Sequence, residues 1–102
     1  MTVRFLAVYE APADPEAFDR HYSEIHIPLL RQLRGLSRYS ISRDITPLHG
    51  TPCYLVAELD WDTMDELRAA FATPEGRATA ADGARLQELA PVRRMTFTVD
   101  GP

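Results

Sequence analysis

The sequence predicts a mixed α+β domain with the element order β-α-β-β-α-β, and three observations support this prediction. Two segments, 2–9 and 53–61, are apolar on both alternating faces, which is typical of central strands covered on both sides. Two other stretches carry apolar residues at helical spacing behind helix-capping residues. Residues 36–45 and 92–99 alternate between apolar and polar side chains, as strands with one covered face do.

The first half of the chain opens with the strand at 2–9. Asp14 and Pro15 then supply an N-cap residue and a proline at the first helical position, which predicts a helix start. The apolar residues of this helix recur at spacings of three and four, so they form a stripe that should lie on the sheet. The stripe consists of Phe18, Tyr22, Ile25, Leu29 and Leu33.

Pro28 stands inside this stripe and removes one helical hydrogen bond. Two interpretations remain open. Either the helix kinks near the carbonyl of Glu24, or a shorter helix ends there and a second one begins at Pro28. Gly35 occupies the position of a helix C-cap, and the strand expected at 36–45 is half covered or at an edge of the sheet.

The second half repeats this arrangement. Turn-forming residues at 46–52 precede the second central strand at 53–61. Thr63 and Glu66 have the spacing of a capping box, which predicts a helix that runs to about Ala72.

A further helix is expected directly after it. Thr73 followed by Pro74 is again a cap and a first-turn proline, although Gly83 weakens the expectation that this helix is continuous. Pro91 ends the helix, and 92–99 forms the last strand.

This order of elements is the split βαβ or ferredoxin-like arrangement, in which helices cover one face of an antiparallel sheet and the first and third strands are central. The two segments that are apolar on both faces occupy those central positions. The helices leave the other sheet face uncovered, so one alternating set of apolar residues from each central strand would face water. In the first strand this is the set with Leu6 and Val8 or the opposite set, and in the other central strand it is the set with Tyr54 and Val56 or the opposite set. We therefore predict a two-fold homodimer whose sheets face one another.

Length, charge and cysteine usage limit the possible functions. The 102 residues fit one domain spanning 1–102, and the net charge of -4 with dispersed arginines argues against a nucleic-acid partner. The lone Cys53 cannot close an intrachain disulfide and has no neighbour that would activate it as a nucleophile, which suits a small core residue in a reducing cytoplasm. Apolar runs are short, so we expect neither secretion nor a membrane partner.

The polar residues of the first helix are the strongest candidates for chemistry. His26 lies one turn after Tyr22 at the border of the apolar stripe, and His21 lies at the opposite border, so either ring could reach a cleft. His26 could transfer a proton while Tyr22 orients a substrate oxygen. The alternative is that His26 only forms a hydrogen bond at the helix edge, and the sequence leaves both open.

Other candidate site residues could also have a purely structural or surface role. Tyr39 in the second strand and His49 in the following turn could reach a ligand, but a strand tyrosine can equally be packing and a loop histidine surface. A metal is disfavoured because His21 and His26 are five residues apart, not the four that present two ligands together. No phosphate-binding loop is present, and we expect no cofactor.

Several segments together resemble the EthD-like family. They are residues 18–29 (FDRHYSEIHIPL), residues 33–36 (LRGL), Tyr39, residues 71–76 (FATPEG) and Ala81-Asp82. The resemblance spans nearly the whole chain and implies a dimeric α+β barrel of ferredoxin-like protomers, with a small-molecule pocket between sheet and helices in each. Family members include muconolactone methylisomerase, fungal polyketide decarboxylase or dehydratase-like enzymes and the EthD protein of ether degradation, so the family indicates the fold better than the reaction.

Carried over by motif position, the resemblance implies that Tyr22, His26 and Tyr39 are catalytic pocket residues, with His49 as a further binding residue. Trp61 and Phe71 would add aromatic lining, although Phe71 could equally be core.

The leading hypothesis is a cofactor-independent enzyme that isomerises, cyclises or dehydrates a small phenolic, lactone or polyketide-like substrate through proton transfer by His26. Two alternatives stay open: a non-catalytic accessory or small-molecule binding protein that acts beside an oxygenase, and a cofactor-free or haem-linked monooxygenase.

Overall fold

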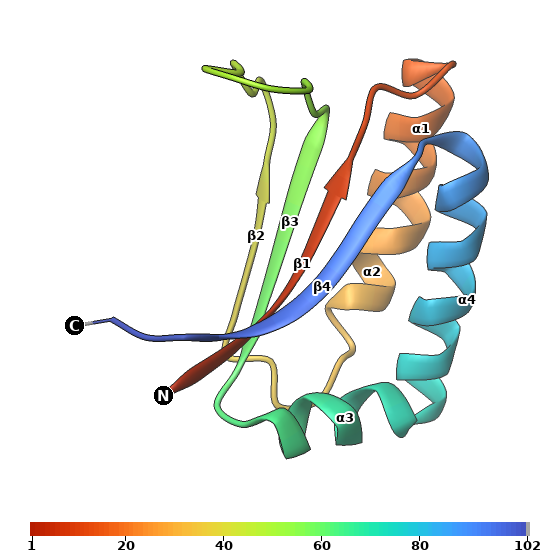
Figure 1. Cartoon of the computed structure of the whole chain (residues 1–102). Helices are drawn as coiled ribbons and strands as arrows, with labels where there is room; N and C mark the ends of the chain where they lie inside the picture. The colour runs from red at the N-terminus through yellow and green to blue at the C-terminus, as the bar shows by residue number, and fades with distance from the viewer. Residues whose placement is uncertain (102) are drawn as a thin grey trace.

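The structure is a computed structural model that describes residues 1–101. In chain order the elements are β1 (Thr2–Tyr9), α1 (Pro15–His21), the π-helical segment η1 (Tyr22–His26), α2 (Ile27–Leu30), β2 (Arg38–Ser42), β3 (Leu55–Trp61), α3 (Met64–Ala72), α4 (Pro74–Leu89) and β4 (Val92–Val99). The strands form an antiparallel sheet in the order β2-β3-β1-β4. The helices lie on one side of this sheet (Figure 1), which confirms the predicted ferredoxin-like α+β fold.

The two central strands are the ones predicted from their two-sided apolar pattern. β1 and β3 pair from Val3 opposite Trp61 to Tyr9 opposite Leu55. β2 and β4 each pair with one central strand and are the sheet edges. β2 is shorter than the predicted 36–45, because Asp44 has a φ of 55° that turns the chain out of the extended conformation.

The predicted helix starts are confirmed at three caps. Asp14 accepts a hydrogen bond from the backbone N–H of Ala17, and Thr63 accepts one from Glu66. Thr73 does the same for Gly76 at the start of α4. α4 then runs without a break through Gly83, so this glycine does not interrupt the helix.

The first helix departs from the predicted pattern at Ile25, which is 47% exposed. Tyr22–His26 is π-helical, and the N–H of Ile27 donates to the carbonyl of Tyr22, five residues back. This wider turn rotates the following residues, so that His26 and Leu30 face inward where α-helical spacing predicts Ile25 and Leu29.

Pro28 explains where the wide turn occurs. It lacks an N–H and sits in the first turn of α2, so the interpretation with a second short helix is closer to the structure than a kink in one helix.

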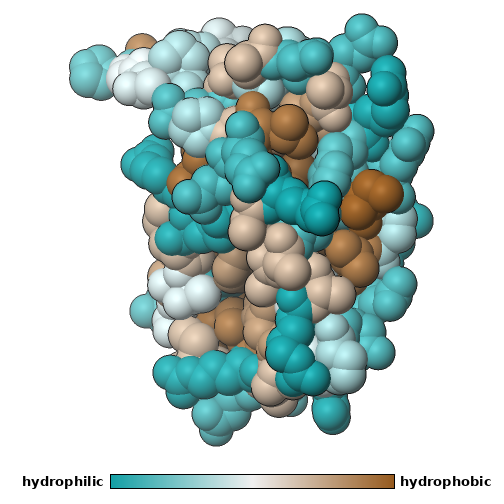
Figure 2. Space-filling model, turned by 90° about the vertical axis from the view of Figure 1, so that its right-hand side faces the viewer, coloured by the Kyte–Doolittle hydropathy of each residue, from teal (hydrophilic) through white to brown (hydrophobic). Residues whose placement is uncertain are grey.

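The two faces of the sheet are covered differently. Helix-facing side chains of β1 and β3 are buried, except the half-buried Phe5. The outer surface of the helices is mostly hydrophilic with scattered hydrophobic side chains (Figure 2). The uncovered face of the sheet has an apolar half and a charged half. The apolar half comprises Leu6, Val8, Val56, Met95 and Phe97; the charged half comprises Arg4, Arg38, Glu58 and Asp60.

The sequence makes Leu6, Val8, Tyr54 and Val56 candidates for an uncovered sheet face. Three of them lie together on this face: Leu6, Val8 and Val56. Tyr54 does not, because its ring packs against Phe18 and its hydroxyl donates to Asp19. In residues 1–101, no helix combines the length and the hydrophobicity that crossing a membrane requires.

Candidate functional site

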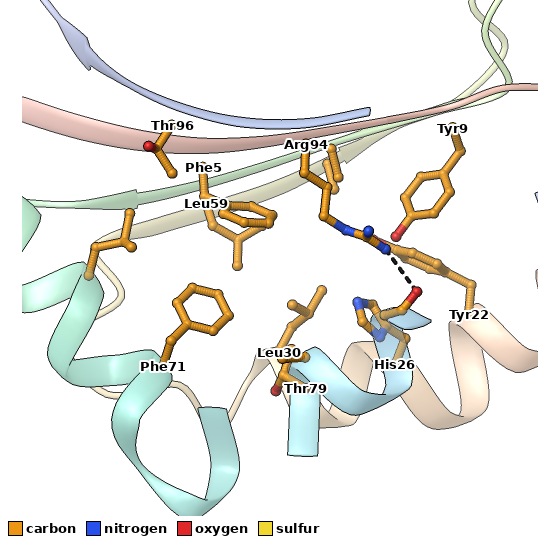
Figure 3. Close-up of a pocket in the computed structure, with 15 residues that line it drawn as sticks. Phe5, Tyr9, Tyr22, His26, Leu30, Leu59, Phe71, Thr79, Arg94 and Thr96 are labelled. Atoms are coloured by element: carbon orange, nitrogen blue, oxygen red, sulfur yellow. Dashed lines mark hydrogen bonds between the residues drawn. The ribbon is translucent and has the colours of Figure 1, made fainter. Parts of the chain in front are cut away.

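A cavity of about 330 Å³ lies between the helix-facing side of the sheet and the helices. Its walls are mostly apolar, and the polar side chains of Tyr9, Tyr22, His26 and Arg94 gather at one end (Figure 3). The lining consists of Phe5, Ala7, Tyr9, Tyr22, His26, Leu30, Ala57, Leu59, Leu67, Phe71, Thr79, Ala80, Gly83, Arg94 and Thr96. A space of this size and composition is typical of a site for a small, largely apolar molecule.

Behind the cavity wall, Asp82 of α4 holds two histidines of the first helix. Its Oδ1 lies 2.7 Å from Nε2 of His21, and its Oδ2 lies 2.9 Å from Nδ1 of His26. Asp82 is 6% exposed, as is His26. Only His26 of the two histidines lines the cavity.

The π-helical segment explains how both histidines reach one carboxylate. A spacing of five residues separates two side chains around an α-helix, but it brings them together across a π-turn. The expectation from α-helical geometry, with His21 and His26 on opposite borders of the stripe, is therefore wrong, because the helix is not α-helical at this point.

This arrangement assigns the proton of the His26 ring. An ionised carboxylate only accepts hydrogen bonds, so Nδ1 of neutral His26 carries the proton and donates it to Asp82. Nε2 is then unprotonated and can act as a base. Burial lowers the pKa of His26, and this effect exceeds the opposing influence of Asp82; Arg94 and His21 lower the pKa further. His26 is thus neutral at pH 7.

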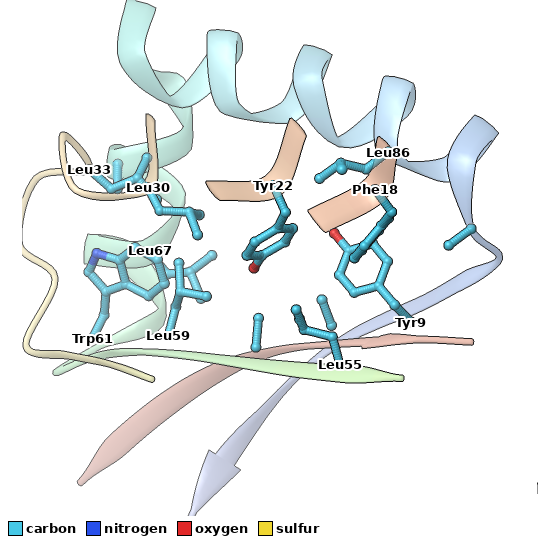
Figure 4. Packing of buried hydrophobic residues seen from close by; sticks show 14 of the residues in the cluster. Tyr9, Phe18, Tyr22, Leu30, Leu33, Leu55, Leu59, Trp61, Leu67 and Leu86 are labelled. Atoms are coloured by element: carbon cyan, nitrogen blue, oxygen red, sulfur yellow. The ribbon is translucent and has the colours of Figure 1, made fainter. Parts of the chain in front are cut away.

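Tyr22 supplies a hydroxyl beside this imidazole. Its ring is fully buried, with its centroid 5.1 Å from that of His26, and it lies among core side chains between helix and sheet (Figure 4). Its hydroxyl is a buried polar group without a hydrogen-bond partner among the described residues. Burial raises the pKa of Tyr22, so the hydroxyl keeps its proton and is available as a donor.

Arg94 brings a positive charge to the same end of the cavity. It extends from β4, donates from Nη2 to the carbonyl of Gly83 at 2.8 Å and from Nη1 to the side chain of Gln87 at 3.3 Å. Tyr9 lies next to it (Figure 3). Burial raises the pKa of Tyr9, and the Arg94 charge opposes that rise.

The six residues singled out from the sequence fall into two groups. His26, Tyr22 and Phe71 line the cavity. Tyr39, Trp61 and His49 do not: Tyr39 is half-buried on β2, Trp61 is fully buried with its Nε1 donating to the carbonyl of Arg34, and His49 lies in an exposed loop. The catalytic and binding roles assigned to all six stay predictions.

Two polar residues of the site were missed by the sequence reading. Asp82 was noticed only as part of a family segment, and Arg94 only as a member of a basic pair. The one local signal for Asp82 is an acidic residue on an otherwise small and apolar helix face. Arg94 has no such signal, since its position depends on the register between β4 and β1 and on contacts with α4.

Comparison with known proteins gives the family. Residues 10–90 match the family model described as the EthD domain. The chain belongs to the EthD family. A curated EthD-related protein from Rhodococcus erythropolis, named as an uncharacterized 11.0 kDa protein in the thcB-thcC intergenic region, is 42% identical over 81 residues, or 78% of each chain.

Solved structures similar to this EthD chain extend the comparison. An ethyl tert-butyl ether D (EthD) family protein from Bacillus halodurans is 32% identical with a TM-score of 0.88, over 98% of this chain and 100% of the other. A variant of SnoaB, a cofactor-independent oxygenase from Streptomyces nogalater, is 19% identical with a TM-score of 0.73, over 99% and 95% of the two chains. The likeness to SnoaB shows a common fold only.

Proposed function

We propose that this EthD-family protein is a cofactor-independent enzyme that uses His26 to move a proton on a small phenolic, lactone or polyketide-like substrate bound in the apolar cavity. One observation carries the proposal. The imidazole of His26 lines the cavity while its Nδ1 is held by the buried carboxylate of Asp82, which leaves Nε2 as a base.

The chemistry follows from the protonation states. Nε2 of His26 takes a proton from an acidic C–H or O–H bond of the substrate, and the electron pair of that bond passes to a substrate oxygen as an enolate or phenolate. Asp82 stabilises the imidazolium that forms, because its charge is opposite and its hydrogen bond to Nδ1 is kept. The hydroxyl of Tyr22, which has no hydrogen-bond partner within residues 1–101, donates to the developing oxyanion.

Returning the proton to another substrate atom completes an isomerisation, and returning it to a leaving hydroxyl completes a dehydration. Both outcomes conserve the proton and need no redox partner. The apolar walls exclude water, which strengthens each of these electrostatic interactions.

The experiment measures a proton shift directly. The isomerisation of α-angelica lactone and the exchange of the α-protons of 2-tetralone are followed by NMR in D₂O with the wild-type protein and with His26→Gln. We expect catalysis above that of equimolar free imidazole, and a loss of about 10²- to 10⁴-fold in His26→Gln. Equal rates in wild type and His26→Gln would overturn the proposal.

A binding or accessory role is the second candidate. Its support is the name of the Rhodococcus relative, which places that protein between two other genes. Probe binding by the wild type without any proton exchange favours this role, and oxygen consumption with a phenolic probe favours the monooxygenase alternative.

We also propose a homodimer that buries the uncovered sheet face. Met95 is 40% exposed and lies opposite Leu6, and Phe97 is 37% exposed and lies opposite Arg4; Val8 and Val56 pair on the same face. An apolar area of this kind at the centre of a sheet is typical of an interface.

A further inference from the structure

The cavity has one charged side chain in its lining, and that charge is positive. Arg94 is this residue, and the lining contains no aspartate or glutamate. The buried carboxylate of Asp82 lies outside the lining and is already held by His21 and His26. A ligand in the cavity therefore contacts a cationic side chain and no anionic one, although the whole chain has a net charge of -4.

Arg94 also has unused binding capacity. The ion pairs found in residues 1–101 do not include Arg94, and its two hydrogen bonds go to the neutral groups of Gly83 and Gln87. A guanidinium has further N–H donors in a planar fork that matches a carboxylate.

A second, independent observation points to a ligand at the same end of the cavity. The hydroxyl of Tyr22 is completely buried and has no partner among residues 1–101. Leaving such a group unpaired costs about 1 to 3 kcal/mol. A ligand oxygen in the cavity would pair with it.

The other end of the cavity is mostly apolar, with Thr96 as a polar side chain beside Phe5 (Figure 3). Phe5 and Phe71 face each other there with ring centroids 5.5 Å apart, and Leu59 lies beside them (Figure 3). The cavity thus has an aromatic end and a cationic end, which suits a molecule with one apolar body and one acidic group.

Gly83 accounts for the placement of the guanidinium. A Cβ at this position would lie 3.2 Å from Nη2 of Arg94, tighter than ordinary contact. The carbonyl of Gly83 accepts from that same nitrogen. The glycine in the middle of α4, which weakens a helix by about 1 kcal/mol relative to alanine, makes room for Arg94 over the cavity.

We infer that the cavity selects small monoanionic carboxylates with an apolar or aromatic body, that Arg94 receives the carboxylate, and that Gly83 and Gln87 position Arg94 for this purpose. This inference rests on the proposed use of the cavity and adds the substrate class. Placing the carboxylate beside Arg94 sets the apolar body against the phenylalanines and brings the carbon next to the carboxylate toward His26.

Isothermal titration calorimetry with phenylacetate and its uncharged counterpart phenylacetamide tests the selection. The wild type should bind phenylacetate about tenfold more tightly, a modest factor because Arg94 is exposed to solvent. Arg94→Met keeps an apolar stem and removes the charge, so it should lose this preference while its affinity for phenylacetamide stays. Higher salt should reduce the preference of the wild type.

Arg85→Met is the matched control, since Arg85 is an exposed residue of α4 outside the lining. It removes the same charge and should keep the preference for phenylacetate. Gly83→Ala should reduce the preference by displacing Arg94. A preference that survives in Arg94→Met, or that is absent from the wild type, overturns the inference.

The experiments distinguish a failure of carboxylate selection by Arg94 from a failure of proton transfer by His26. Loss of the anion preference in the binding experiment while proton exchange by His26 persists removes only the carboxylate selection. Selective binding of phenylacetate without proton exchange removes only the catalytic role of His26.

Discussion

Oδ2 of Asp82 lies 2.9 Å from Nδ1 of His26, although the two residues are 56 positions apart in the sequence and belong to different helices. The contact joins a carboxylate and an imidazole that are both nearly inaccessible to solvent. It fixes the orientation of the ring and the position of its proton. Through this contact, α4 determines that His26 of η1 has its unprotonated nitrogen at Nε2. His21 completes the contact from the opposite side of the carboxylate.

Asp82→Asn should therefore affect both stability and the state of His26. One amide replaces a carboxylate that accepts from two imidazoles, so one histidine faces an N–H group instead of an acceptor. We expect the pKa of His26 to fall further and the free energy of unfolding to drop by about 1 to 3 kcal/mol. NMR titration of the histidine ring protons and urea unfolding measure the two effects.

Asp65→Asn provides the control for that variant. Asp65 is an exposed residue of α3 whose Oδ1 lies 3.8 Å from Nη1 of Arg68, and such surface pairs contribute little to stability. A loss of stability in Asp65→Asn as large as that in Asp82→Asn would contradict the role given to Asp82.

Stability should depend on pH through His26 with a defined sign. The pKa of His26 in the folded protein lies below the value of 6.5 expected for the unfolded chain. As pH falls below 6.5, the unfolded state takes up the proton first, so the free energy of unfolding decreases until the folded pKa is passed. Well above pH 6.5 both states are neutral at this residue and its contribution is constant.

His26→Gln tests this sign by urea unfolding between pH 5 and 8. The groups that face His26 are Asp82 of α4, His21 of α1, Tyr22 of η1 and Arg94 of β4, and they remain in the variant. We expect the variant to lose part of the stability decrease below pH 6.5. An identical pH dependence in both proteins would show that His26 does not titrate as proposed.

The variant Tyr22→Phe shows whether the hydroxyl of Tyr22 has a structural or a functional role. The hydroxyl of Tyr22 is buried without a partner in the described part of the chain, so its removal relieves an unpaired polar group and leaves the ring packing of Tyr9 and Phe18 in place. We expect the thermal midpoint to stay or to rise, while proton exchange on the probe falls by about tenfold or more. A marked loss of stability would indicate a hydrogen bond that the hydroxyl makes within the protein.

Sequence patterns predicted the fold well because the strands and helices follow regular periods. β1 and β3 show the two-sided apolar alternation of central strands, and the caps at Asp14, Thr63 and Thr73 are local signals. The same reasoning placed Ile25 in the core, since it assumes an α-helical period that η1 does not have. The spacing of apolar residues in an α-helix does not reveal where a wider π-helical turn occurs.

The candidate site was predicted less completely for a related reason. His26 and Tyr22 could be picked out because both lie near the apolar stripe of one helix. Asp82 and Arg94 reach the site from α4 and β4, and their positions depend on packing between elements far apart in the chain. His49 was predicted from its residue type in a turn and from the family resemblance, and the structure places it in an exposed loop.

Phe97→Asp should dissociate the proposed dimer. Phe97 is 37% exposed on the uncovered sheet face, and a carboxylate there would be buried without a partner when two sheets meet. Ile25→Asp is the matched control, because Ile25 is 47% exposed on the helix side of the molecule. Light scattering coupled to size-exclusion chromatography should give twice the chain mass of 11.5 kDa for the wild type and the control, and the single mass for Phe97→Asp. A monomeric wild type would mean that the apolar half of this face serves another partner or none.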